Sequence, residues 1–107
     1  MADPSRTVIV FRDAAGNEPF TIWLHSPGTR RRILKCLLRV EQGHFGDRKP
    51  VGGGVHELRL FFGPGYRVYF GEDGDKIVVL LTGGDKDDQS RDIQQAQVYW
   101  QEYLSHE

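Results

Sequence analysis

Two arginines and a tyrosine share one predicted β-hairpin, and their side chains are the ones best suited to chemistry in this sequence. The hairpin runs from Val55 to Phe70 and is interrupted by Gly63-Pro64-Gly65, which predicts a three-residue loop. In the register set by that loop, Arg59 lies opposite Tyr69, and Arg67 projects from the same face. Guanidinium groups bind phosphate oxygens through paired hydrogen bonds, so this face is a candidate site for phosphate chemistry.

The other face of the hairpin is apolar and should belong to the core. Its three expected cross-strand pairs are Phe62 with Tyr66, Leu60 with Val68, and Leu58 with Phe70. A shift by one residue would turn the arginines into the core, where unpaired guanidinium groups are very unfavourable. We therefore expect the arginine face, which also carries Glu57 and Phe61, to lie open on the sheet.

More basic side chains follow one side of a predicted helix. Pro27, with Ser26 as the cap, starts this helix, which should end near Glu41. Three cations recur every four residues along it: Arg31, Lys35 and Arg39. The opposite side is expected to be buried and consists of Ile33, Leu34, Leu37, Leu38 and Val40. A basic stripe is usually a solvated helix face, but it is also able to bind RNA phosphates.

Two connecting segments supply the remaining candidates. The connection from Gln42 to Gly54 contains Arg48, a further candidate for RNA binding, and Lys49. Loops of this length in a compact domain are usually functional or mobile. The glycine turn after the last predicted strand adds Asp85 and Lys86.

The charge of the chain is segregated along its length. The net charge is −1 over 107 residues, yet residues 27–70 contain nine Lys or Arg and three Asp or Glu. A protein with this distribution can present a positive surface to a polyanion while staying close to neutral overall.

Several functional classes are excluded by composition. The apolar run Ile77–Leu81 is far too short to span a bilayer, so we expect no membrane association. Cys36 is the single cysteine, which rules out an intrachain disulfide and makes a reducing cytoplasm the simplest compartment. The four histidines are scattered through the sequence, so we expect neither a metal nor a cofactor.

The chemistry that these side chains permit without a metal is cleavage of RNA. The 2′-OH of the substrate is the nucleophile, and the protein must hold it in line with the phosphorus. Arginines stabilise the developing dianionic phosphorane. A general base is also needed, and a Lys, Tyr or Asp with a suitable pKa can serve.

The predicted elements give one α+β domain over residues 1–107, in the order β-α-α-β-β-β-α. The first strand lies in 6–12, a short helix contains Phe20, Trp23 and Leu24, the last strand spans Lys76–Thr82, and the last helix runs from about Asp88 to Leu104. Three consecutive strands joined by short turns form a small antiparallel sheet, with the N-terminal helical hairpin on one face. The final helix is expected to cover part of the other face.

Three segments of this sequence resemble the phage-derived addiction-module killer proteins, the HigB-like branch of the RelE/ParE superfamily of bacterial toxins. They are Asp47–Arg59, Gly63–Phe70 and Leu81–Ile93, within a similarity that extends from about residue 8 to 104. The resemblance implies a toxin of a type II toxin–antitoxin system that cleaves mRNA on the ribosome. It also implies a cognate antitoxin, usually a helix-turn-helix protein.

Carried onto this chain, the catalytic residues of the superfamily ribonucleases correspond to Lys49, Arg59, Arg67, Tyr69 and Lys86. The turn Gly83-Gly84-Asp85-Lys86 departs from the C-terminal motif of the best-understood ribonuclease branch, so the identity of the general base stays open. The same superfamily includes poisons of DNA gyrase, because a shared fold does not fix the target. A toxin acting on a protein target and a degenerate domain that only binds antitoxin are the alternative functions.

Overall fold

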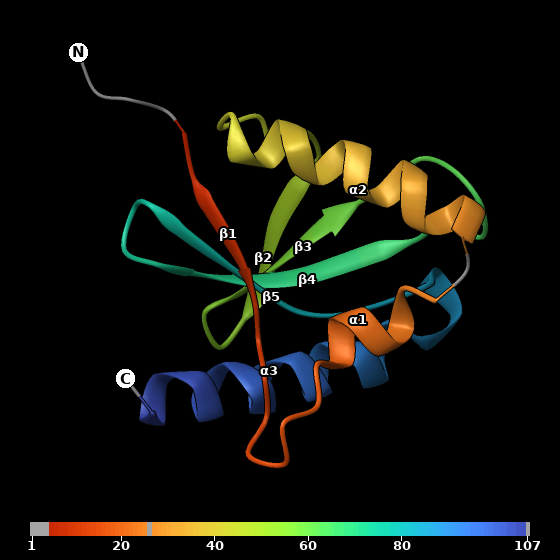
Figure 1. Ribbon diagram of the computed structural model, residues 1–107. Coiled ribbons are helices and arrows are strands. Elements are labelled where there is room, and N and C mark those ends of the chain that lie inside the picture. The colour runs from red at the N-terminus through yellow and green to blue at the C-terminus, as the bar shows by residue number, and fades with distance from the viewer. Residues whose placement is uncertain (1–4, 26, 107) are drawn as a thin grey trace.

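The computed structural model describes residues 5–25 and 27–106, so the expected cap Ser26 lies outside the described residues. Five strands form one sheet in the order β1-β5-β4-β3-β2 (Figure 1). The elements are β1 (Thr7–Val10), α1 (Pro19–Trp23), α2 (Pro27–Glu41), β2 (Arg48–Gly52), β3 (Val55–Arg59), β4 (Arg67–Asp73), β5 (Ile77–Gly84), a 3-10 turn (Lys86–Asp88) and α3 (Gln89–Ser105).

The α+β class is confirmed, and the sheet contains one strand more than predicted. The expected loop over residues 42–54 includes β2, which pairs antiparallel with β3 at the edge of the sheet. β2 contains Pro50, which is tolerated in an edge strand. Because proline is rare in strands, the sequence of this segment does not indicate a strand. β1 pairs in parallel with β5, so the sheet is mixed rather than wholly antiparallel.

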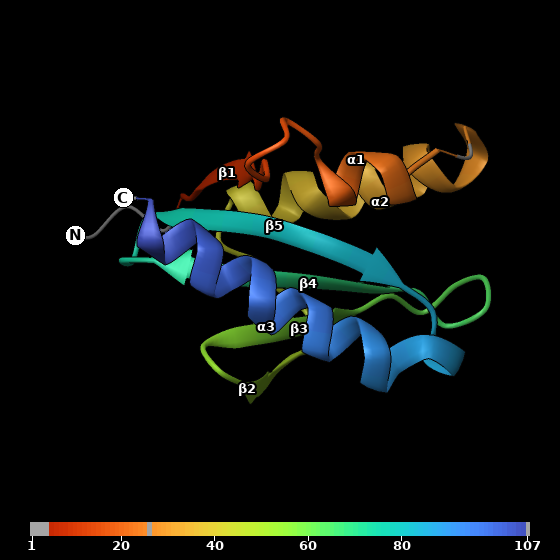
Figure 2. The same ribbon diagram turned by 90° about the horizontal axis from the view of Figure 1, so that it is seen from below.

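Helices cover both faces of the sheet. Figure 2 shows α1 and α2 on one face and α3 on the other. On the first face Ile33, Leu37 and Val40 of α2 pack with residues that include Leu58, Val68, Phe70 and Leu80. On the second face Ala96 and Trp100 of α3 pack with residues that include Val55, Tyr69, Val79 and Leu81. In the part of the chain that is described, no helix has the length and apolarity needed to cross a membrane.

The buried face of α2 is narrower than the sequence predicted. Leu34 and Leu38 were expected in the core, but they are 41% and 58% exposed. They lie at the margin of the apolar stripe, where Leu34 and Leu38 border a groove together with Val8 and Val10 of β1.

The hairpin of β3 and β4 has the predicted faces but a different register. Arg59 pairs with Arg67 and Glu57 with Tyr69, so the predicted pair Arg59–Tyr69 was wrong by two residues. The backbone N–H of Leu60 donates to the carbonyl of Tyr66, which leaves five residues in the loop rather than three. A shift of two residues keeps every side chain on its face, which is why the predicted faces survive.

Candidate functional site

A buried carboxylate, that of Glu57, lies at the centre of the candidate site. Glu57 is in β3 and is 0% exposed. Its Oε1 lies 3.4 Å from Arg59 Nε, 3.7 Å from Arg67 Nε and 4.0 Å from Lys49 Nζ. Three cations from three strands therefore surround a single negative charge, which is the arrangement that a buried carboxylate requires.

The strand register explains why these side chains meet. Lys49 of β2 and Tyr69 of β4 are both direct partners of Glu57, while Arg59 pairs with Arg67. Residues that pair across antiparallel strands project to the same face. All five side chains therefore lie on the face that α3 partly covers.

The first residue of α3 completes the cluster. Gln89 donates a hydrogen bond of 2.7 Å from Nε2 to Glu57 Oε2. The carboxylate thus joins the helix to the sheet as well as holding the cations. Neither Glu57 nor Gln89 was predicted as a site residue, although Glu57 shares a strand face with Arg59 and three cations on one face need a counter-charge.

Arg67 is fixed in place by the hairpin loop. Its side chain is 14% exposed, and Nη1 donates to the carbonyls of Gly65 and Tyr66 at 3.0 and 3.4 Å. Its Nε makes no hydrogen bond of good geometry within the described residues and faces the Glu57 carboxylate. The guanidinium is therefore oriented before any ligand arrives.

Tyr69 is not on an open surface, which corrects the sequence-based expectation. It is 0% exposed, because α3 covers this part of the sheet. Burial raises the pKa of its hydroxyl, and the nearby carboxylates of Glu57 and Asp92 raise that pKa further. Within the described residues the hydroxyl has no hydrogen bond of good geometry. In this structure Tyr69 cannot touch a substrate.

Of the predicted catalytic cations, Lys49, Arg59 and Lys86 are the most accessible to solvent. The Lys49 and Arg59 side chains are 45% and 36% exposed, and Lys86 is also exposed. A side-chain carbon placed at Gly65 would lie 3.4 Å from Lys86 Cδ and 3.5 Å from Arg67 Nη1, so these two side chains converge on the same loop. The structure therefore brings together four predicted cations at one end of the sheet.

Asp85, considered above as a proton acceptor, has a structural role. Its carboxylate accepts a 3.0 Å hydrogen bond from the backbone N–H of Asp87 and caps the 3-10 turn. Asp92, in the first turns of α3, lies against Gly84, and burial raises its pKa.

The predicted RNA-binding residues are distributed over other surfaces. Arg48 lies on the opposite face of β2 from Lys49, pairs with Glu72, and places its guanidinium 4.3 Å from the centre of the Phe45 ring. Arg31, Lys35 and Arg39 are exposed along α2, as predicted. The structure does not bring any of these into contact with Glu57.

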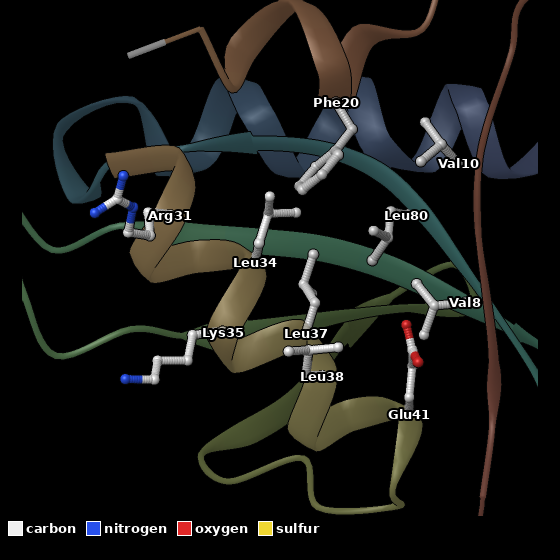
Figure 3. A pocket seen from close by; sticks show the side chains of 10 residues that line it. All are labelled: Val8, Val10, Phe20, Arg31, Leu34, Lys35, Leu37, Leu38, Glu41 and Leu80. Atoms are coloured by element: carbon white, nitrogen blue, oxygen red, sulfur yellow. The ribbon is translucent and has the colours of Figure 1, made fainter. Parts of the chain in front are cut away.

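Beside α2 lies an apolar groove of about 660 Å³, open between this helix and the edge strand β1. Figure 3 shows Leu34, Leu37 and Leu38 facing Val8 and Val10 across it. Arg31 and Lys35 stand at its outer rim and Glu41 at its far end. Leu34 and Leu38, which were expected in the core but are exposed, thus form one wall of this groove.

Comparison with known proteins gives one informative match. No family model matches the chain. Over 86 residues the chain is 42% identical to an uncharacterized protein of Haemophilus influenzae, and this similarity covers 78% of the chain and 87% of that protein.

Proposed function

The chain belongs to the same family as this Haemophilus influenzae protein, and we propose that it is the toxin of a type II toxin–antitoxin system. The proposed activity is that of a metal-independent endoribonuclease, which cuts mRNA on the ribosome in the cytoplasm and so inhibits translation. The observation that carries the proposal is the convergence of Lys49, Arg59, Arg67 and Lys86 at one end of the sheet. The resemblance to the RelE/ParE superfamily is independent support.

The proposed mechanism follows from what each cation can reach. Single-stranded RNA lies over the exposed Lys49 and Arg59, with the scissile phosphate next to the guanidiniums of Arg59 and Arg67. The 2′-OH loses its proton to a base and attacks the adjacent phosphorus, forming a 2′,3′-cyclic phosphate. The P–O bond to the next nucleotide breaks, and its 5′-oxygen takes up a proton. The arginines stabilise the negative charge that develops on the phosphorane oxygens.

The general base must be a group that solvent reaches. Tyr69 and Glu57 are both 0% exposed, which argues against either one. Lys49 and Lys86 are exposed on the two sides of the guanidiniums, and they are the candidates that remain for moving the two protons.

The proposed antitoxin binds the groove between α2 and β1. Exposed Leu34 and Leu38 give it an apolar wall, and Arg31 and Lys35 give it a basic rim. An amphipathic antitoxin segment with acidic side chains along one edge fits both features. Such binding should weaken with salt, because exposed charges are screened within roughly 10 Å at 0.1 M salt.

The decisive experiment is induced expression in bacteria, followed by primer extension on abundant transcripts. We expect growth arrest and new 5′ ends within reading frames. Lys49→Ala, Arg59→Ala and Lys86→Ala should each lower cleavage by about 100-fold, the usual effect of removing one preorganised donor. Arg12→Ala, which removes an exposed ion pair with Glu18 away from the site, is the matched control. Growth arrest with intact mRNA would refute the nuclease.

A non-enzymatic toxin with a protein target such as DNA gyrase is the second candidate. The observation that favours it is the burial of both Glu57 and Tyr69, which keeps this carboxylate and this phenol away from any substrate. Double-strand DNA breaks and an SOS response on expression, without mRNA cleavage, would identify this activity. Harmless expression of folded protein would identify a degenerate domain that only binds antitoxin.

A further inference from the structure

A phenylalanine at the start of the β3–β4 loop is highly exposed. Phe61 is 82% exposed, in contrast to its neighbours Leu60 and Phe62, which pack against the core. Within residues 5–25 and 27–106, no aromatic ring or cation contacts its ring. An exposed aromatic ring of this size offers a flat apolar surface on which a ligand can stack.

Phe61 is among the residues that line a cavity of about 240 Å³ between α2 and β3. Its walls are apolar and include Phe45, Leu58 and Phe62. The residues that line it also include two arginines, Arg39 and Arg59, and two residues that can accept hydrogen bonds, His44 and Asp47. An aromatic face beside donors and acceptors suits a flat heterocycle with polar edges.

We propose that this cavity is a subsite for one base of single-stranded RNA, with the base stacked on Phe61. Proteins that bind single strands combine a cationic surface along the backbone with aromatic side chains on which bases stack. The subsite rests on the proposed ribonuclease function, and it specifies which part of the substrate the loop would recognise.

Arg59 links the subsite to the reaction centre. It lines the cavity, and its Nε also lies 3.4 Å from Glu57 within the cluster of cations. Its Nη1 is 3.9 Å from Oδ2 of Asp47, which is another of the residues that line the cavity. A nucleotide whose phosphate contacts Arg59 therefore has its base within reach of Phe61. Arg39, which the sequence suggested for RNA binding, is placed to contact the polar edge of that base.

The test measures binding of the whole protein to a fluorescein-labelled six-nucleotide RNA with 2′-O-methyl groups. This RNA cannot be cleaved, because its nucleophile is blocked. Phe61→Ala should weaken binding by about tenfold, the effect expected from loss of one stacked base. Phe61→Trp should preserve binding. Val98→Ala, which changes a 59% exposed residue on α3, should leave it unchanged.

Salt dependence and an abasic scan separate the base from the phosphate. Phe61→Ala should leave the slope of log affinity against log salt unchanged, whereas Arg59→Ala should reduce it by about one. Removing one base from the RNA should weaken binding to the wild-type protein at a single position. At that position the Phe61→Ala variant should show no further loss.

Each outcome decides the proposal. Equal binding by Phe61→Ala and wild type overturns the subsite and assigns the exposed ring to a protein partner. If transcripts are nevertheless cleaved in cells, the proposed function stands without the subsite. Failure of the wild-type protein to bind this RNA at any salt also overturns the subsite, and failure of cleavage in cells then refutes the ribonuclease as well.

Discussion

The carboxylate of Glu57 and the guanidinium of Arg67 form an ion pair inside the protein, with 3.7 Å between Oε1 and Nε. The carboxylate is fully buried, and the arginine side chain is 14% exposed. Both charges are therefore held away from water, and each depends on the other for compensation. Arg67, whose guanidinium suits it to phosphate chemistry, is thus also part of the structural framework.

Replacing Arg67 should destabilise the protein, which changes the expectation drawn from the sequence that it is a surface residue. Removing one partner of a buried pair typically costs about 3–5 kcal/mol, so we expect a loss near 3 kcal/mol for Arg67→Ala. Arg59→Ala should lose at most about 1 kcal/mol, because its ion pair is 36% exposed and screened by solvent. Urea unfolding at neutral pH measures the loss of stability in each of the two variants. Equal midpoints for the two variants would contradict the buried pair.

Tyr69→Phe should preserve both folding and cleavage. The hydroxyl is buried without a hydrogen bond of good geometry, so its removal should change stability by less than about 1 kcal/mol or increase it. Thermal melting and transcript cleavage test this together. A stable Tyr69→Phe variant that no longer cleaves RNA would restore Tyr69 to a catalytic role.

Stability should fall at high pH because of the same hydroxyl. Burial raises the pKa of Tyr69 above its ordinary 10.0, so the folded protein keeps a proton that the unfolded chain releases above that pH. This contribution is complete below pH 10 and is lost as pH rises further. Urea unfolding between pH 8 and 11 should show a shallower decline for Tyr69→Phe than for wild type. Parallel declines would show that Tyr69 is not the source.

Gly71→Ala should destabilise the contact between α3 and the sheet. A side-chain carbon at Gly71 would overlap the ring of Trp100, and overpacking of this kind costs about 1–3 kcal/mol. Gly28→Ala in α2 is the control, since nothing lies within 4 Å of the added carbon and alanine favours a helix. Thermal melting should place Gly28→Ala at or above wild type. If Gly71→Ala melted at the same temperature as Gly28→Ala, Trp100 would have to move aside without a loss of stability.

Leu38→Asp should disrupt antitoxin binding without unfolding the protein. Leu38 is 58% exposed, so the substitution should change stability by only about 0.5 kcal/mol. It would place a carboxylate on the apolar wall of the groove, and affinity for the co-expressed antitoxin should drop at least about tenfold. Val98→Asp, at 59% exposure on α3, is the matched control. Normal neutralisation of Leu38→Asp would place the antitoxin elsewhere.

The sequence predicted correctly those features of the fold that depend on residues close together in the chain. Helix α2 begins at Pro27, as predicted, and the chain leaves it at Gly43, whose φ of 88° few other residues adopt. The two faces of the β3–β4 hairpin were also correct, because alternation depends only on period two. The register of the hairpin was predicted wrongly. The Tyr66 ring packs over Gly63 and helps to shape a wider loop.

Non-local contacts account for what the sequence did not predict. The parallel pairing of β1 with β5 joins residues far apart in the chain, and neither strand encodes its partner. The burial of Glu57 was missed because carboxylates are normally exposed. The burial of its carboxylate is compensated by Lys49, Arg59 and Arg67, which come close only in the folded protein, and by a hydrogen bond from Gln89.

The place of β5 in the sheet has a consequence for how the protein is made. β5 lies between β1 and β4, and Gln89 of α3 contacts Glu57. During synthesis the first strand must therefore wait for a partner until residues 77–84 have emerged, and the site must wait longer still for Gln89. Protease digestion of ribosome-bound chains ending near residue 76 should find them unprotected. We thus expect the nascent chain to lack the assembled Glu57 cluster until Gln89 has emerged from the ribosome.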